Sequence, residues 1–115
     1  SGSNYIAYLF ASLDGISKVG SYTGNGTSQV IDCGFTSGAR FVLIKKTSSA
    51  NGDWEVFDTE RGIVAGGDAE LRLNDTNAEY AGYDQIDPNS SGFTVVNTNN
   101  QTNESGETYI FYAIA

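Results

Sequence analysis

Short runs of β-branched and aromatic residues alternate with clusters of Gly, Asn, Asp and Ser along the whole chain. Runs of the first kind favour strands, and clusters of the second kind favour the turns between them. No window of a dozen residues keeps the apolar spacing of an amphipathic helix, and Pro88 is the only proline. The runs that predict strands are NYIAYLF, KVGSYT, QVIDCGF, ARFVLIKK, DWEVFDT, ELRLN, GFTVV and TYIFYAIA.

About eight short strands in one chain predict an all-β fold. We expect an antiparallel β-sandwich with jelly-roll-like connections, in which two sheets share one core. A closed barrel is the alternative. The length of 115 residues fits a single module that spans residues 1–115. A chain of this length is long enough to bury one core.

Acidic residues outnumber basic ones by fourteen to six, which gives a net charge of -8. This charge repels nucleic-acid phosphates and anionic lipids, so we expect no nucleic-acid partner. No apolar run approaches the ~18 residues of a membrane span, and no signal-peptide pattern is present, so we expect no membrane insertion. The single cysteine, Cys33, cannot form an intramolecular disulfide. Stability must therefore come from core packing.

The first and last strand-like runs differ from the rest because they are continuously apolar. Tyr5–Ala11 reads YIAYLFA and Tyr109–Ala115 reads YIFYAIA. Continuous apolar runs predict strands that are covered on both faces, so removing the first should cost several kcal/mol at roughly 1.5 to 3 kcal/mol per buried side chain. The two runs share four of seven positions, as if the first were the closing strand of a preceding copy. Chance likeness between hydrophobic strands is the alternative.

The stretch TGNG, residues 23–26, invites comparison with phosphate-binding loops. A Walker loop has Lys and then Ser or Thr after its last glycine, and a Rossmann turn opens a helix; this stretch has neither. Asn25 and Gly26 tolerate positive φ and predict a tight hairpin between VGSYT and QVIDC. Cys33 follows in the second of these strands, and the chain has no His to activate it. We predict that Cys33 is buried and unreactive.

Acidic residues could supply a pair of catalytic carboxylates. Glu55, Asp58 and Glu60 cluster after Trp54, but strand alternation places Glu55 and Asp58 on opposite faces. We therefore predict solvated carboxylates, no catalytic residue and no enzymatic activity. The loops NGD, GGDAE, LNDTN and QIDPNSSG are oxygen-rich, yet none has the spacing of a known calcium loop. We predict no cofactor, with calcium as the alternative that no motif supports.

Two polar segments are predicted to lie at the surface. Asn97–Glu107 is almost wholly polar and predicts an exposed loop between the last two strands. Residues 78–92 place two tyrosines among acids and amides, a mixture that can stack on a sugar ring and bond its hydroxyls. The predicted ligand-binding residues are Tyr80, Tyr83, Asp84 and Gln85. The alternative is that both tyrosines are packing residues.

The stretches SKVGSYTGNG, DCGFTSGARFVLIKKT, GDWEVFDT and SGETYIFYAIA lie in this order along the chain. Together they resemble a β-rich domain of tail-fibre and related virion proteins of tailed, especially marine, bacteriophages. The resemblance covers nearly the whole chain but brings no catalytic or ligand motif with it. It implies a virion location, adhesive or structural work, and a place as one module of a longer fibre chain.

We therefore expect a non-enzymatic tail-fibre module that binds a host-surface receptor, a glycan. Its partners would be that receptor and other virion fibre segments, with a homotrimer in the longer chain, because fibres trimerise about their long axis. One alternative is a purely structural, trimerising virion domain; exposed aromatics in a cleft would favour binding over this. The others are a carbohydrate-binding module of a secreted bacterial protein and a glycosidase, which requires two facing carboxylates about 5 to 10 Å apart.

Overall fold

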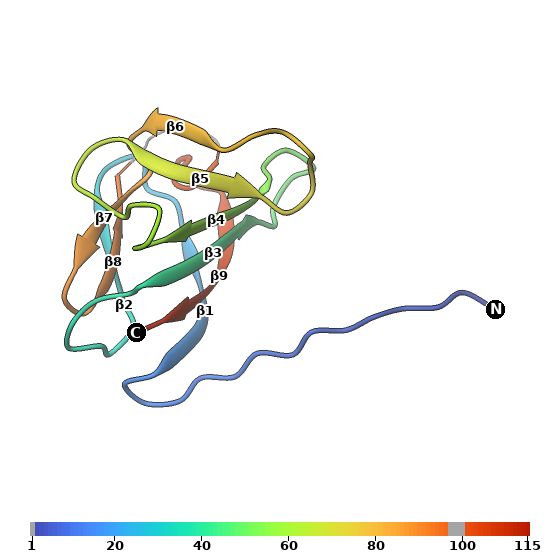
Figure 1. Cartoon of the computed structure of the whole chain (residues 1–115), viewed down its shortest axis with the longest axis horizontal. Coiled ribbons are helices and arrows are strands. Elements are labelled where there is room, and N and C mark those ends of the chain that lie inside the picture. Colours follow the sequence, from blue (N-terminus) through green and yellow to red (C-terminus); the bar gives the residue numbers. More distant parts are fainter. Residues whose placement is uncertain (1, 97–100) are drawn as a thin grey trace.

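The computed structural model describes residues 2–96 and 101–115, and this part of the chain is all-β, with nine strands and no helix (Figure 1). Within it, no helix has the length and apolar character that crossing a membrane requires. The strands are β1 (Ser17–Thr23), β2 (Gln29–Asp32), β3 (Phe41–Lys46), β4 (Trp54–Asp58), β5 (Asp68–Arg72), β6 (Tyr80–Tyr83), β7 (Ile86–Asn89), β8 (Gly92–Val95) and β9 (Thr108–Ile114).

The strands form two antiparallel sheets that face each other across one core. The larger sheet has the order β1-β9-β3-β4-β5-β6, and the smaller has the order β2-β8-β7. Phe93 of β8 packs edge-on against Phe111 of β9, with 5.5 Å between the ring centroids. Buried side chains of both sheets join one hydrophobic cluster. The predictions of an all-β fold and of antiparallel sheets are therefore confirmed.

Strand alternation explains which residues reach this core. Successive side chains of a strand point to opposite faces, and in β3 the buried residues Val42, Ile44 and Lys46 alternate with half-buried ones. β9 lies between β1 and β3 and buries Tyr109, Phe111 and Ala113. Its inward face is therefore the centre of the core.

The predicted hairpin at TGNG is wrong, because β1 and β2 belong to different sheets. The segment between them is a crossing connection in which Gly26 alone has positive φ. A Cβ on Gly24 would lie 2.1 Å from the Glu104 carbonyl oxygen, so only glycine fits there. Asn103, fully buried, binds the crossing: its Oδ1 accepts from the Asn25 N–H, and its Nδ2 donates to the Thr27 carbonyl at 2.7 Å.

Two further predictions about loops need correction. Residues 97–100 of the predicted exposed loop lie outside the described residues, but Thr102 and Asn103 are fully buried. They are buried because they satisfy polar groups between the sheets rather than facing solvent. Residues 78–92 also contain two strands, β6 and β7, that the sequence did not predict.

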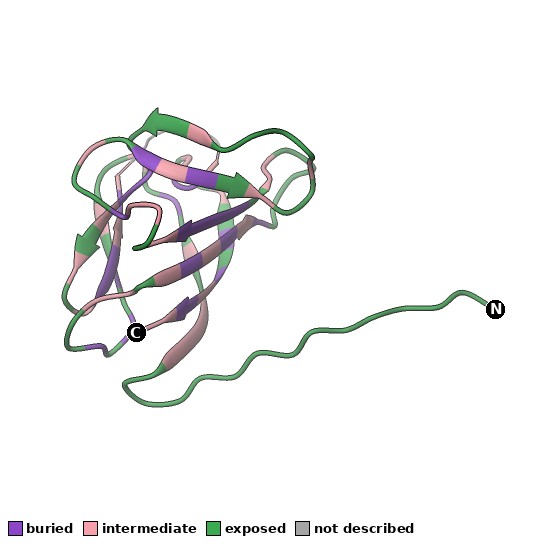
Figure 2. Cartoon of the chain, in the orientation of Figure 1, coloured by how far each residue is buried: buried purple, intermediate pink, exposed green. Residues whose placement is uncertain are grey.

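The prediction of a buried first strand is wrong. Residues 2–11 form an extended arm without strand pairing, and it leaves the domain with its side chains exposed (Figures 1 and 2). Tyr5 and Leu9 are 90% and 88% exposed. Phe10, at 51%, is the most covered large side chain of the arm, because its ring stacks on Tyr112 at 4.3 Å. The arm does not fill a place in this domain's core.

Deleting residues 1–10 should therefore leave the fold almost as stable as before. The main loss is the Phe10–Tyr112 stack, and such ring pairs contribute about 0.5 to 1.5 kcal/mol. Phe57→Ala is the matched core variant, because its ring is fully buried and such a change costs about 3 to 5 kcal/mol. Urea unfolding of both variants measures the difference. A deletion that costs as much as Phe57→Ala would contradict the exposed arm.

Candidate functional site

The outer face of the six-stranded sheet carries an unbroken apolar row across five strands. The register pairs Val19 of β1 with Tyr112 of β9, Tyr112 with Leu43 of β3, Leu43 with Val56 of β4, and Val56 with Leu71 of β5. These residues alternate with the core residues of the same strands, so they point away from the core. An outward face of a sandwich-like fold is commonly polar, and here the polar outward side chains, Ser21 and Lys45 among them, lie in the rows beside this apolar one.

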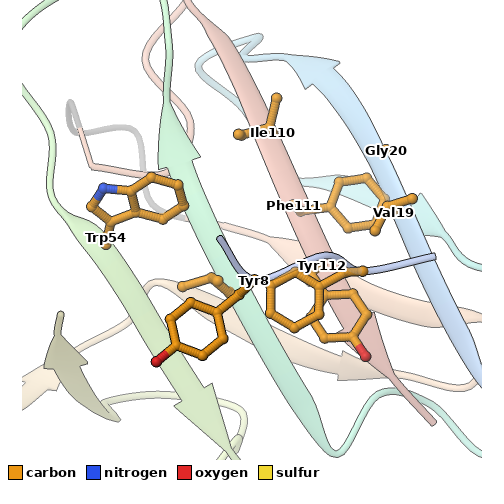
Figure 3. Close-up of a pocket in the computed structure, with 9 residues that line it drawn as sticks. Tyr8, Val19, Gly20, Trp54, Ile110, Phe111 and Tyr112 are labelled. Carbon is orange, nitrogen blue, oxygen red and sulfur yellow. The ribbon is translucent and has the colours of Figure 1, made fainter. Parts of the chain in front are cut away.

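A groove of about 370 Å³ lies along this row. In Figure 3 the arm crosses over the strands, and Tyr8 and Trp54 border the same space near Tyr112. A neighbouring hollow extends the apolar surface to Leu73 and Asn74. The described residues that line the groove are Tyr8, Phe10, Val19, Gly20, Leu43, Trp54, Ile110, Phe111 and Tyr112.

The chemistry of the groove suits an apolar partner. None of its described lining residues is charged, and its polar side-chain groups are two phenol hydroxyls and one indole N–H. Trp54 is 38% exposed and Ile110 is 42% exposed. Lys45 lies between them in the register, and its ammonium donates to the Lys46 and Gly52 carbonyls. Large aromatic side chains that are partly open are typical of the centres of protein interfaces. We call this surface, the row together with Trp54 and Ile110, the outer apolar face.

A second feature, which is polar, lies inside the domain between β4, β5 and the segment before β7. Glu55 and Glu70 are both buried, and Arg72 approaches both carboxylates: its Nη2 lies 2.9 Å from Glu70 Oε1 and its Nε 3.4 Å from Glu55 Oε1. Gln85 Nε2 donates to Glu70 Oε2 at 3.1 Å, and Thr102 Oγ1 donates to Gln85 Oε1 at 3.1 Å. These five residues form the buried carboxylate cluster.

One guanidinium cannot neutralise both buried carboxylates. Among the described residues, neither oxygen of Glu55 has a hydrogen-bond donor of good geometry. Burial, and next the hydrogen bond and charge of Glu70, raise the Glu55 pKa to about 9. This direction favours a protonated Glu55 at neutral pH, which can share its proton with Glu70 and removes one of the two adjacent negative charges. Neither carboxylate lines the groove, so the buried carboxylate cluster is a feature separate from it.

Sequence reasoning placed the acids after Trp54 at the surface, and this is wrong for Glu55, which is 0% exposed. Glu60 is exposed as expected. Asp58 is half-buried, and Arg61 Nε donates to its carboxylate at 2.7 Å. Burial alone would raise the Asp58 pKa, but the hydrogen bonds from Arg61 lower it below its ordinary value. The predicted separation of Glu55 from Asp58 onto two faces is confirmed by the pairing of β3 with β4.

The four predicted ligand-binding residues do not share one open surface. Tyr83 and Asp84 are exposed, and Tyr80 is half-buried beneath the Arg72 guanidinium, 4.0 Å from its ring centroid. Gln85 is 2% exposed, and its amide is bonded within the buried carboxylate cluster. The part that faces solvent is therefore Tyr83 and Asp84, and sugar binding by them stays a prediction.

Two other predicted features concern reactive or metal-binding groups. Cys33 is buried as predicted, and burial, followed by the charge of Asp32, raises its pKa to about 11. Within residues 2–96 and 101–115, no three His, Cys, Asp or Glu side chains gather as a metal would require. Side-chain oxygens of the segments that suggested calcium accept backbone N–H groups, as Asp75 does from Asn77 and Asp68 from Ile86.

A protein family described as a domain of unknown function (DUF7483) matches residues 1–115. The chain belongs to this family. No curated protein and no solved structure matches it. For a DUF7483 domain, the outer apolar face and the buried carboxylate cluster are therefore the observations from which function must be argued.

The raised pKa of Glu55 makes stability depend on pH in a defined direction. The folded domain keeps a proton that the unfolded chain releases above its ordinary pKa of 4.5, so the unfolding free energy falls as the pH rises from there to about 9. Glu55→Gln keeps a donor toward Glu70 but cannot ionise. We therefore expect urea unfolding to show that wild type loses more unfolding free energy than the variant between pH 5 and 8, by more than about 1 kcal/mol.

The control for this experiment is Glu60→Gln, which removes an exposed carboxylate. Its unfolding free energy should depend on pH in the same way as that of wild type. If Glu55→Gln and wild type lose stability in parallel as the pH rises, the shared proton is refuted.

Cys33 should react slowly with a thiol reagent in the folded DUF7483 domain. Its Sγ lies in the core, and burial disfavours the thiolate that reacts. Because it is the only cysteine, labelling with an aromatic disulfide reports this site alone. We expect labelling within seconds in denaturant and at the rate of unfolding in buffer. Equal rates under both conditions would mean that the thiol is accessible.

Proposed function

We propose that the domain is a non-catalytic module of a bacteriophage tail fibre and that it works by protein–protein contact through the outer apolar face. The observation that carries this proposal is the apolar row from Val19 to Leu71, which runs over five strands on the face away from the core. Leu71, Trp54 and Ile110 are the most open large side chains of the outer apolar face, at 38%, 38% and 42% exposure. Exposed apolar side chains that gather on one face mark interaction sites. A partner in the assembled protein would cover it.

The remaining parts of the proposal follow from the sequence. The resemblance to tail-fibre domains supports a virion location and a homotrimeric fibre. The buried carboxylates support a non-enzymatic role, because Glu55 and Glu70 are enclosed with Arg72 rather than open to a substrate. The edge-on contact of Phe93 with Phe111 between the two sheets supports the jelly-roll-like sandwich as the detailed architecture.

Host-glycan binding is the second candidate function. Open aromatic rings favour it, because Tyr8 and Trp54 border the groove and Tyr83 is exposed beside Asp84. Sugar recognition also needs polar groups that bond the hydroxyls, and the groove has few. Protein contact is therefore the function that the groove supports best. A carbohydrate-binding module of a secreted bacterial protein rests on the same residues and shares this weakness.

Lysine substitutions on the outer apolar face should weaken assembly of the natural protein that contains this domain. Trp54→Lys and Ile110→Lys change partly exposed side chains of that face, so the fold itself should persist. Each should weaken association at least about tenfold, as charges at the centre of an interface do. The measurement is the mass of the assembly by light scattering across a dilution series, with circular dichroism as the check on folding.

Val30→Lys is the matched control for these variants. Val30 is also an exposed apolar residue, but it lies on β2 in the other sheet. Assembly should tolerate this change. If all three lysine variants assemble like wild type, the outer apolar face is not a contact surface. Binding of host polysaccharide that Tyr83→Ala abolishes would favour the second candidate function.

A further inference from the structure

The arm has two apolar faces, and its own domain contacts only one of them. In an extended chain, alternate side chains point to opposite sides. Tyr8 and Phe10 lie toward the groove, where Phe10 stacks on Tyr112. Tyr5 and Leu9 alternate with them and are 90% and 88% exposed. An apolar surface of this kind calls for a second body on the far side of the arm.

The sequence of β9 indicates what that second body is. Aligned with Tyr109–Ala115, the arm residues Tyr5 and Leu9 correspond to Tyr109 and Ala113, which β9 buries completely. Ile6 and Tyr8 correspond to Ile110 and Tyr112, which β9 turns to the outer face. The positions that β9 directs into a core are thus as open in the arm as the outward positions Ile6 and Tyr8, which are 84% and 81% exposed, and Phe10 alone is half covered.

The two ends of the domain lie together in a way that fits this correspondence. The Ala115 N–H donates to the Ile16 carbonyl at 2.9 Å. The last residue of the β9 segment therefore lies beside the turn, residues 12–16, that connects the arm to β1 (Figure 1). Since Ala11 corresponds to Ala115 in the alignment, one such turn could follow either segment directly.

We propose that Tyr5–Ala11 is the β9 strand of a second, preceding domain of this same fold, and that this domain packs against the outer apolar face. Tyr5 and Leu9 would enter the core of the preceding domain. Tyr8 and Phe10, on its outward side, would make the contacts with Tyr112 and Trp54 that they make here. The two domains then cover each other's outer faces. This inference rests on the proposed function in that it uses the outer apolar face as a contact surface.

A chain in which residues 12–108 are followed directly by residues 5–115 tests the inference. Its first domain has no β9 except the arm, so it folds only if the arm can take that place. Calorimetry should then give an unfolding enthalpy about double that of residues 1–115, because this enthalpy scales with the number of folded residues. Leu9→Asp should remove the additional enthalpy, whereas Ile6→Asp, at an outward position, should retain it. An enthalpy equal to that of 1–115 alone counts against the inference.

In the first test chain, Ala7 takes the place of Phe111 and can leave the first core underpacked. A second chain avoids this substitution and tests the junction between the two domains. It joins residues 12–115 directly to residues 12–115, which keeps the β9 sequence. With Trp54→Phe in the first domain, the remaining Trp54 reports on the groove of the second. Its acrylamide quenching should fall to about half of that in 1–115, because interface cores exclude solvent. A ten-residue Gly-Ser linker at the junction is the control and should restore part of the quenching.

Two outcomes separate this inference from the proposed function. If neither two-domain chain folds its first domain or protects Trp54, while lysine on the outer apolar face still disrupts the natural assembly, the face is a contact surface with a different occupant. The inference is then overturned and the proposed function stands. If the lysine variants also assemble normally, both are overturned.

Discussion

The six-stranded sheet carries apolar side chains on both of its faces, and much of the rest of the structure depends on this constraint. The smaller sheet has three strands and packs on the inner face only, where Phe93 meets Phe111. The outer row from Val19 to Leu71 has no sheet above it. In this structure the arm covers part of this face, and it leaves Trp54 partly open. We propose that another domain or chain buries the rest.

The inner face has the opposite difficulty, because it is too wide for the smaller sheet to cover with apolar side chains. Beyond the apolar cluster, β4 and β5 turn Glu55, Glu70 and Arg72 inward. Gln85 and Thr102, from two connecting segments, complete the hydrogen bonds that these groups need. Buried polar groups are stable only when they are paired, and burial of Glu55 beside Glu70 raises the Glu55 pKa and favours its protonated form. The same connections that close the sandwich-like core therefore carry its polar contacts.

Local composition predicted the strands that are rich in β-branched and aromatic residues. β3 and β9 are rich in β-forming residues, and their inward and outward positions follow the two-residue period. β6 and β7 were missed because Gly82 and Pro88, residues that usually mark turns, lie within them. The sheet partner of β1 could not be predicted, since the choice between a hairpin and a crossing depends on a distant residue, Asn103, that binds the connection. The candidate site was missed for a related reason. Leu43 and Tyr112 are neighbours on the outward face because β3 pairs with β9, and the sequence does not reveal this strand order.

The wrong prediction that Tyr5–Ala11 is a buried strand of this domain is the most informative one. A continuously apolar strand needs cover on both sides, and that physical requirement holds for Tyr5–Ala11 whether or not its own domain provides the cover. Sequence reasoning assumed that the requirement is met within one domain. The structure provides contact for Tyr8 and Phe10 but leaves Tyr5 and Leu9 open. On our proposal, the arm keeps the sequence of a core strand at a place where its own fold has no position for it, because the core that it completes belongs to a neighbour.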